Sequence, residues 1–216
     1  MKTLVLLSGG LDSTVLLYFV RTYSSEVRAI SFDYGQRHAI ELTHAKKIAA
    51  NAGVKHTIVQ MQGIKEVLNR GVLTAGGEVP EGHYAEESMK QTVVPNRNMI
   101  MLSIAAGHAL ANGIDCVKFA AHAGDHAIYP DCRPEFADAL NAAIRQADWS
   151  RTVIAAPFIR FSKGEIVTTG ARLNVPFADT WSCYKGGAIH CGKCGTCVER
   201  KEAFATALIA DPTEYE

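Results

Sequence analysis

The sequence carries no excess of charge of either sign. Lysine and arginine together number 22, and aspartate and glutamate together also number 22. Proteins that hold duplex DNA or tRNA by its phosphates usually present a positive field, so this balance argues against nucleic acid as a direct partner. The count leaves room for a local basic patch, because net charge does not describe how charges are distributed.

Long apolar runs are missing as well. Residues 1–7 are mostly apolar, but the run ends at Gly9 and Gly10, far short of the apolar core of a signal peptide. No other stretch approaches the length of a membrane span. Six cysteines without an export signal indicate a reducing compartment, where thiols serve metals or catalysis more often than disulfides. We therefore expect a cytoplasmic protein with no membrane contact.

Short apolar runs alternate with segments of helical pattern along most of the chain. Strands are predicted at residues 2–7, 27–32, 55–61, 116–121 and 152–156, and helices at 14–23, 38–52, 98–111, 133–147 and 162–172. This alternation predicts an α/β fold with a doubly wound, Rossmann-like parallel sheet. The helix at 98–111 is nearly all apolar or small, so we expect it to be buried on several sides. Residues 62–92 lack a clear period and predict an irregular excursion near a site.

A glycine-rich segment lies between the first predicted strand and the first helix. Its adjacent glycines let backbone N–H groups turn inward, and the helix N-terminus adds partial positive charge, which together predict an anion cradle. Three hydroxyl side chains can add hydrogen bonds to phosphate oxygens. A Walker loop needs a lysine here and none is present, so this is not the motif of kinases and GTPases. The predicted nucleotide-binding residues are Leu7, Ser8, Gly9, Gly10, Leu11, Asp12, Ser13 and Thr14.

Four cysteines lie close together near the C-terminus with the spacing C-x7-C-x2-C-x2-C. They are Cys183, Cys191, Cys194 and Cys197. Four thiolates can close a tetrahedron around zinc with no open position, which would make the site structural. A C-x2-C-x2-C run also opens ferredoxin motifs, so an iron–sulfur cluster is the alternative.

The remaining cysteines and three histidines are assigned by their surroundings. Cys116 falls in an apolar strand and is expected to be core packing, whereas Cys132 lies in a polar loop and is a candidate for lining a site. His190 is expected at the surface rather than as a metal ligand. His122 and His126 are not expected to form a metal-binding pair, because the glycine between them argues against a helix.

The change of composition near residue 181 predicts a domain boundary. A chain of 216 residues can bury one substantial core with a small appendage. We expect residues 1–180 to form a nucleotide-binding domain and residues 181–216 to form a small metal-binding module, because residues 181–200 are rich in cysteine, glycine and lysine.

Polar side chains follow two of the predicted strands and precede the apolar helix. Tyr34 offers an aromatic face and Gln36 an amide, which suit a flat heterocycle. Arg97 can bind a carboxylate or phosphate in bidentate fashion. Asp131 and Arg133 add one charge of each sign after the fourth strand. Each segment alone is equally well explained as a turn with a helix cap, but together these five residues are the predicted substrate-binding set.

The motifs, taken together, resemble a known family. SGGLDS is similar to the PP-loop of ATP-pyrophosphatases, and with DYGQRH, VPNRN, YPDCRPEF, SKGEIV and TWSCY followed by HCGKCGTC the chain resembles the 7-cyano-7-deazaguanine synthases from end to end. The resemblance implies ATP and Mg²⁺ at the loop, with Asp12 near the phosphates, zinc at the four cysteines, and a homodimer. Asn96 departs from the glycine expected there, although asparagine tolerates a left-handed backbone. Residues 122–126 also depart from the expected pattern.

The resemblance implies a ligase that forms C–N bonds. The reaction would convert 7-carboxy-7-deazaguanine, ammonia and ATP to 7-cyano-7-deazaguanine (preQ0) through an adenylated carboxylate and an amide. The product would lead toward queuosine, archaeosine or deazaguanine-modified DNA. Asp12, Arg97 and Lys163 are the predicted catalytic residues, the last two stabilising charge on phosphates. The alternatives are a variant that stops at 7-amido-7-deazaguanine, a PP-loop tRNA-thiolating enzyme, and a relative without enzymatic activity that binds nucleotide and a partner protein. The balanced charge argues against the thiolating enzyme, and the intact SGGLDS and DYGQRH argue against loss of activity.

Overall fold

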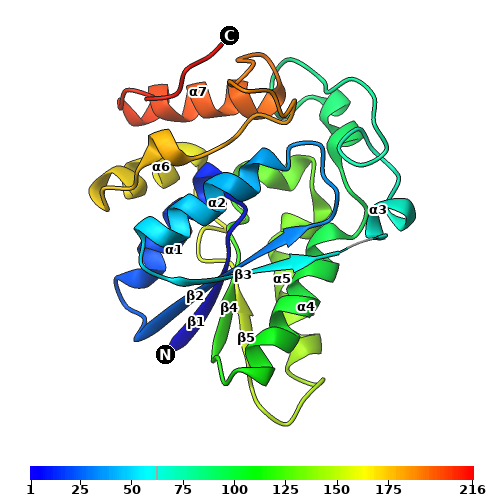
Figure 1. The fold of residues 1–216 in the computed structure, drawn as a ribbon, viewed down its shortest axis with the longest axis vertical. Helices are drawn as coiled ribbons and strands as arrows, with labels where there is room; N and C mark the ends of the chain where they lie inside the picture. The colour runs from blue at the N-terminus through cyan, green and yellow to red at the C-terminus, as the bar shows by residue number, and fades with distance from the viewer. Residues whose placement is uncertain (62) are drawn as a thin grey trace.

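The fold is built on one parallel sheet, seen here in a computed structural model that describes residues 1–61 and 63–216. The strand order is β3-β2-β1-β4-β5 (Figure 1). The strands are Lys2–Leu6 (β1), Glu26–Asp33 (β2), Lys55–Gln60 (β3), Cys116–Lys118 (β4) and Val153–Ala155 (β5). All five predicted strands are confirmed, although β4 ends at Lys118 rather than at residue 121.

The order of the strands creates a topological switch beside β1. Thr3 lies opposite Val27 of β2 on one side and opposite Cys116 of β4 on the other. The chain runs outward from β1 through β2 to β3 and then returns to build the opposite side. The loops that follow β1 and β4 therefore diverge, and they open a crevice at the carboxyl ends of the strands, where such folds bind ligands.

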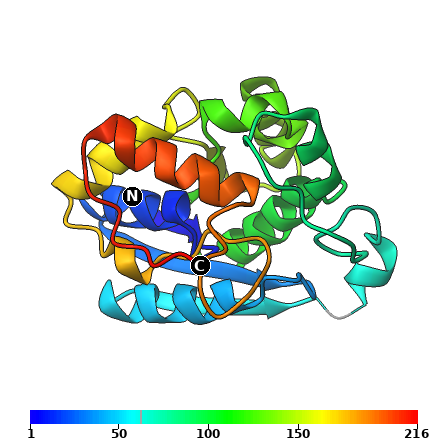
Figure 2. The same ribbon diagram turned by 90° about the horizontal axis from the view of Figure 1, so that it is seen from above.

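Helices cover both faces of the sheet, which confirms the doubly wound prediction. Figures 1 and 2 show α1, α2 and α6 on one side and α4 and α5 on the other, with α7 above α6. The helices are Leu11–Arg21 (α1), Ile40–Asn51 (α2), Ile64–Val67 (α3), Arg97–Ala111 (α4), Pro134–Ile144 (α5), Lys163–Arg172 (α6) and Gly195–Ala207 (α7). None of the helices in the described ranges is long and apolar enough to cross a membrane.

Side chains of the central strands alternate between two hydrophobic clusters. Leu4 and Ile30 pack with α4 and α5, whereas Val5 and Ala29 pack with α1, α2 and α6. A strand buried on both faces requires apolar residues at every position, which explains why these strands are continuous apolar runs rather than alternating ones.

The sequence predicted the start of α6 closely, but it placed the start of α1 too late. The helix predicted from residue 162 begins at Lys163, because the Ser162 hydroxyl accepts from the Glu165 N–H and the Glu165 carboxylate accepts from the Ser162 N–H. α1 begins at Leu11, three residues before the predicted start. Gly10 is its extended N-terminal cap, so the polar residues after Leu11 form the first turn of the helix and not a loop.

One packing prediction was wrong, because α4 is buried on one face only. Its buried residues Leu102, Ala105, Ala106 and Ala109 recur at helical spacing and face the sheet. Ile104 is 36% exposed. Apolar composition predicted burial on several sides, but α4 belongs to a single layer of helices, and within the described chain nothing covers its outer side.

The irregular excursion is confirmed for residues 63–92, and residue 62 lies outside the described residues. The segment contains only α3 and a 3-10 helix, Glu87–Thr92 (η1). Three other 3-10 helices occur at Ala123–Ala127 (η2), Pro130–Cys132 (η3) and Phe177–Asp179 (η4). Leu73, Tyr84 and Met89 are buried in the cluster beneath α4, so the excursion packs against the core. A β-bridge joins Glu81 to Cys194, which brings the excursion against the cysteine segment.

Residues 181–216 pack closely on the rest of the chain. α7 lies along α6, and the ring of Phe204 meets that of Phe177 edge to face at 5.0 Å. Phe204 belongs to the same hydrophobic cluster as α1. The boundary after residue 180 stays a prediction, because residues on both sides of it share one core.

Two residues have an exposure that is unusual for their type, an exposed tryptophan and a buried arginine. Trp149, in the loop between α5 and β5, is fully exposed at the end of the sheet opposite the crevice. Arg200, on α7, is fully buried instead. Its guanidinium donates to the Asp211 carboxylate at 3.2 Å and to the Thr180 hydroxyl at 2.7 Å.

We predict that Arg200→Met destabilises the protein by about 3–5 kcal/mol, because it removes the cationic partner of the Asp211 carboxylate and the donor to the buried Thr180 hydroxyl. The expected fall in the midpoint of thermal unfolding is about 10 °C. Arg172→Met, at an exposed position on α6, is the control and should change the midpoint by less than about 2 °C. Equal midpoints for the two variants would contradict a structural role for the Arg200 contacts.

Candidate active site

A pocket opens at the topological switch. It is lined by the segment after β1, by Phe119–Ala121 after β4, by the start of α4 and by the first turns of α7. Because four segments that are distant in sequence converge here, the pocket is the candidate active site. The predicted nucleotide-binding residues that line it are Leu7, Ser8, Gly10, Leu11, Asp12 and Ser13.

The other two predicted loop residues lie behind the lining and shape it. Thr14 is fully buried and its hydroxyl donates to the Gly10 carbonyl at 2.7 Å, so it braces the loop from below. Gly9 has a φ of +92°, a left-handed conformation that favours glycine. Its carbonyl accepts from the Trp181 N–H at 2.9 Å. The loop is therefore held from both sides in one conformation.

Gly9 also lies too close to α2 for any other residue. A Cβ at this position would overlap the Glu41 carbonyl oxygen and approach the Ala45 nitrogen to 2.9 Å. Close approach of the backbone to a helix, together with the positive φ, explains the glycine at this position.

A charged network surrounds the loop. The Lys163 ammonium donates to the Asp12 carboxylate at 2.6 Å and lies 3.1 Å from the Glu199 carboxylate. Burial opposes ionisation of Asp12, but the Lys163 ammonium and His122 outweigh it and hold the pKa of that carboxyl below its usual range. Burial also opposes the charge on Lys163, yet Asp12 and Glu199 raise its pKa above the ordinary value. Lys163 thus lies at the loop, and its predicted catalytic role stays a prediction.

Three residues of the network were not predicted from the sequence. His122 is 1% exposed, and its Nε2 lies 3.3 Å from the Lys163 ammonium. Asp125, which caps η2 together with His122, accepts from the Tyr84 hydroxyl at 3.1 Å. Glu199 is 8% exposed. His122 comes directly after the strand predicted at residues 116–121. Because ligands gather at the ends of parallel strands, this position could have identified His122 as a candidate site residue. That His122 and His126 form no metal-binding pair stays a prediction.

One oxygen of the network has no partner. Asp12 Oδ1 is buried and makes no hydrogen bond with any described residue. A buried anionic oxygen at a phosphate loop fits a Mg²⁺ ion, which prefers carboxylate and phosphate oxygens. The residues present are thus compatible with the Mg²⁺ that the sequence predicted, and its binding stays a prediction.

Arg97 begins α4 on the wall of the pocket beside the phosphate loop. Asn96, just before it, has a φ of 58°, which confirms that asparagine accommodates the left-handed turn. Burial opposes the charge on the guanidinium, but Tyr34 and Tyr184 help to hold its pKa well above the ordinary value. No carboxylate in the described ranges lies within 4.0 Å of the guanidinium. Arg97 is therefore a partly buried cation that lines the pocket and is available to an anionic ligand.

The other predicted substrate-binding residues divide into two groups. Tyr34 is buried and lines the pocket. Gln36 does not, because its amide is used within its own loop: Oε1 accepts from the Tyr34 N–H at 3.0 Å and Nε2 donates to the Phe32 carbonyl at 3.2 Å. Its predicted contact with substrate stays a prediction, and the geometry gives it a role in shaping the loop that presents Tyr34.

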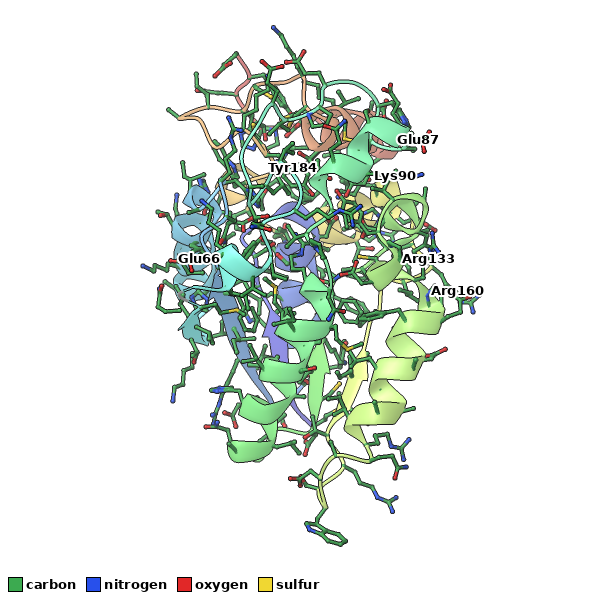
Figure 3. The ribbon with its side chains drawn as sticks, turned by 90° about the vertical axis from the view of Figure 1, so that its right-hand side faces the viewer. Glu66, Glu87, Lys90, Arg133, Arg160 and Tyr184 are labelled. Carbon is green, nitrogen blue, oxygen red and sulfur yellow. The ribbon has the colours of Figure 1, made fainter. Side chains whose placement is uncertain are left out.

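Asp131 and Arg133 also lie outside the lining. The Asp131 carboxylate accepts from the Asn98 N–H at 3.0 Å at the start of α4, so it holds that helix in place. Arg133 is exposed, donates to the His126 carbonyl at 2.8 Å and lies at the edge of the molecule in Figure 3, where Tyr184 lies further inward. Their predicted contacts with substrate stay predictions. Cys132, between them, does line the pocket as predicted, and Cys116 is buried in the core as predicted.

The prediction that His190 lies at the surface was wrong. It is 6% exposed, its Nε2 accepts from the Ser182 N–H at 3.0 Å, and its ring lies 4.2 Å from that of Trp181. Burial, with the nearby Arg200 charge, lowers its pKa to about 4. Its polar neighbours in sequence suggested exposure, but packing of the cysteine segment onto Trp181 buries the ring.

The four cysteines form one buried group. Their sulfur atoms lie within 4.8 Å of one another, and none of the four residues is more than 4% exposed. Hydrogen bonds from the Cys183 and Cys197 thiols lower the pKa of Cys194, which favours a thiolate there. Zn–S bonds of about 2.3 Å place tetrahedral sulfurs roughly 4 Å apart, so the group fits a single zinc ion. An iron–sulfur cluster would need ligands spread around a larger core.

The fold and the pocket define a doubly wound α/β protein with a glycine-containing loop at the topological switch of its sheet. A solved 4-thiouridine synthetase–RNA complex with bound ATP has a similar fold, with a TM-score of 0.54 and 15% identity over 94% of this chain and 53% of that chain. At this identity the likeness concerns the fold alone.

Sequence comparison then identifies the family. The model of the family described as queuosine biosynthesis protein QueC matches residues 2–208, and the chain belongs to this family. It is 54% identical to the 7-cyano-7-deazaguanine synthase of Paracoccus denitrificans over 100% of this chain and 94% of that one. It is 51% identical to the 7-cyano-7-deazaguanine synthase of Methanoregula boonei over the full length of both. The resemblance drawn from the motifs is confirmed.

We predict that Gly9→Ala weakens ATP binding by about 30-fold to 100-fold, because a strained backbone and a forced shift of the loop together cost about 2–3 kcal/mol. Isothermal titration calorimetry measures the change. Gly53→Ala is the matched control, since Gly53 also has a positive φ, of +65°, but has open space where the Cβ would lie. Similar ATP affinity in both variants would show that close packing against α2 does not shape the loop.

Proposed function

We propose that this chain uses ATP to convert 7-carboxy-7-deazaguanine and ammonia to 7-cyano-7-deazaguanine at the pocket beside β1. The observation that carries the proposal is the presence of two cationic side chains in one pocket. Lys163 lies at the phosphate loop, and the Arg97 guanidinium, which has no carboxylate partner among the described residues, lines the same pocket as Tyr34. An enzyme that joins ATP to a carboxylate on an aromatic base needs both.

In the proposed first step, a substrate carboxylate oxygen attacks the α-phosphorus of ATP and pyrophosphate leaves. The loop N–H groups and Lys163 stabilise the negative charge that gathers on the pyrophosphate. Arg97 holds the acid group of the substrate or the α-phosphate beside it, and Tyr34 offers a face for the base. A Mg²⁺ ion held by Asp12 would supply further positive charge to the phosphates.

In the proposed later steps, ammonia attacks the acyl carbon of the adenylate, loses a proton, and releases AMP to give the amide. The amide oxygen then attacks the α-phosphorus of a second ATP and pyrophosphate leaves. Departure of AMP, which carries that oxygen away, and the loss of two protons from the nitrogen over these steps leave the nitrile. Because both adenylates would form in the same pocket, one phosphate loop can serve both activation steps.

The proposal also covers the metal, the assembly and the location. We infer zinc at the four cysteines, because their number, burial and close spacing suit a structural ion. A homodimer is consistent with the uncovered apolar side of α4, where Ile104 is 36% exposed. The cytoplasm is proposed on the abundance of free buried thiols.

The product distinguishes this function from its alternatives. Incubation of the purified protein with ATP, ammonium and 7-carboxy-7-deazaguanine should give the nitrile by mass spectrometry, together with AMP. Accumulation of the amide without nitrile would contradict the proposal and would favour the variant that stops at 7-amido-7-deazaguanine. Absence of AMP would contradict adenylation altogether.

A substitution tests the predicted role of Arg97 in the same assay. Arg97→Met should lower kcat/KM for the carboxylate substrate by about 100-fold, the expected loss for a desolvated charge-assisted pair worth about 3 kcal/mol. Arg145→Met, at an exposed position, is the control. An Arg97→Met variant with unchanged kcat/KM would remove Arg97 from the site.

The metal is tested by elemental analysis of the purified protein. We expect about one zinc per chain and no labile sulfide, since four thiolates bind one tetrahedral ion. Cys191→Ser should lose most of this zinc, whereas Cys116→Ser, at the buried cysteine outside the group, should retain it. Iron with sulfide in the wild-type protein would contradict the proposal and favour the thiolating alternative.

A further inference from the structure

The cysteine site and the phosphate loop are in physical contact through α7. Cys194 is the N-terminal cap of this helix, and Cys197 lies in its first turn. Glu199 follows two residues later and, like Thr196, lines the pocket. Since a helix rises about 1.5 Å per residue, Glu199 lies only about 3 Å along the axis from a cysteine of the metal-binding group.

Glu199 is one of two carboxylates that hold the Lys163 ammonium. Its Oε2 lies 3.1 Å from the Lys163 Nζ, and Asp12 Oδ2 accepts from the same nitrogen at 2.6 Å. The side chains of Glu199 and Lys163 are 11% and 16% exposed. Glu199 Oε1 is also 3.9 Å from the Nε2 of His122. Every charged or hydrogen-bonding contact recorded for the Lys163 ammonium within the described chain therefore involves Asp12, Glu199 or His122.

The two carboxylates approach Lys163 from different parts of the fold. Asp12 belongs to the phosphate loop at the start of α1, whereas Glu199 belongs to α7, whose start is pinned by the cysteine group. With Asp12 alone, the flexible lysine side chain would follow that carboxylate. With both, the ammonium is held between the loop and α7.

The other end of the cysteine segment reaches the loop as well. Trp181, two residues before Cys183, donates its N–H to the Gly9 carbonyl at 2.9 Å. Its indole N–H donates to the Cys183 carbonyl at 2.8 Å. The cysteine segment thus contacts the loop backbone through Trp181, and α7 contacts the Lys163 ammonium through Glu199. Together they form one wall of the candidate active site.

We propose that Glu199 is a positioning residue, which holds the Lys163 ammonium at the pyrophosphate end of the phosphate loop, and that the cysteine site fixes Glu199 by fixing the start of α7. The inference rests on the proposed function only in that the loop holds the pyrophosphate part of ATP. Glu199 itself acts through Lys163 and not on the ligand, because its own negative charge repels phosphate.

The test is a double-mutant cycle on the full-length, metal-loaded protein. The measurement is the Kd of inorganic pyrophosphate in the presence of Mg²⁺, by calorimetry, for Glu199→Gln, Lys163→Gln and the double variant. Glu199→Gln should weaken binding about tenfold in the wild-type background. In the Lys163→Gln background the same change should have no effect or should tighten binding, because only the loss of a repelling charge remains.

A matched control comes from the same helix. Glu202 lies on the exposed side of α7, with its side chain 51% exposed, so Glu202→Gln should bind pyrophosphate as the wild type does. Metal content should stay the same in all variants. Loss of metal from Glu199→Gln would overturn the proposal, because Glu199 would then act on the cysteine site and not on the lysine.

The remaining outcomes separate this inference from the proposed function. Unchanged or tighter pyrophosphate binding by Glu199→Gln, or equal weakening in both backgrounds, would overturn the positioning role even if the wild-type protein makes the nitrile. The expected cycle in a protein that makes no nitrile would support the positioning role and contradict the proposed function alone. A wild-type protein that binds neither ATP nor pyrophosphate would overturn both.

Discussion

The contact between Lys163 and two carboxylates from opposite ends of the chain organises the candidate site. Asp12 comes from the first helix and Glu199 from the last, and the ammonium joins them at 2.6 and 3.1 Å. A buried ion pair is a weak source of stability, since desolvation opposes it. Its value here lies in geometry: three groups that would each be costly to bury alone are buried together where a phosphate loop opens.

That contact is possible because of the strand order. With β1 between β2 and β4, the segments that follow β1 and β4 separate and leave a crevice at their carboxyl ends. Asp12 comes from the loop after β1 and His122 from the segment after β4, and their side chains meet at 4.0 Å. α6 and α7 then pack over the α1 face, and this packing brings Lys163 and Glu199 to the same place. Sheet topology thus sets the location of the site, and helix packing supplies its charges.

Much of the fold and part of the site could be predicted from sequence, for identifiable reasons. The strands were recognisable because burial on both faces favours runs of apolar residues. The phosphate loop was recognisable because a pair of glycines lies between a predicted strand and a predicted helix. Lys163 was found through its motif. Glu199 and His122 were missed because their roles depend on where α7 and η2 come to rest, which no local pattern encodes.

The errors have the same physical origin. His190 and α4 were assigned an exposure from their own composition, yet exposure is decided by neighbours that are distant in sequence. Trp181 covers His190, and nothing in the described chain covers the outer side of α4. Gln36 shows the converse case: its amide suited a heterocycle, but hydrogen bonds within its own loop already use it.

The two tryptophans of the chain occupy opposite environments, and this difference has a practical use. Trp181 borders the pocket, is 5% exposed and lies against the rings of His44 and His190, whereas Trp149 is surrounded by solvent. Emission from Trp149 is therefore a constant background at long wavelength, while that of Trp181 responds to what enters the crevice. Replacement of the exposed indole by phenylalanine leaves the protein with a single tryptophan, located where the candidate active site and the cysteine segment meet.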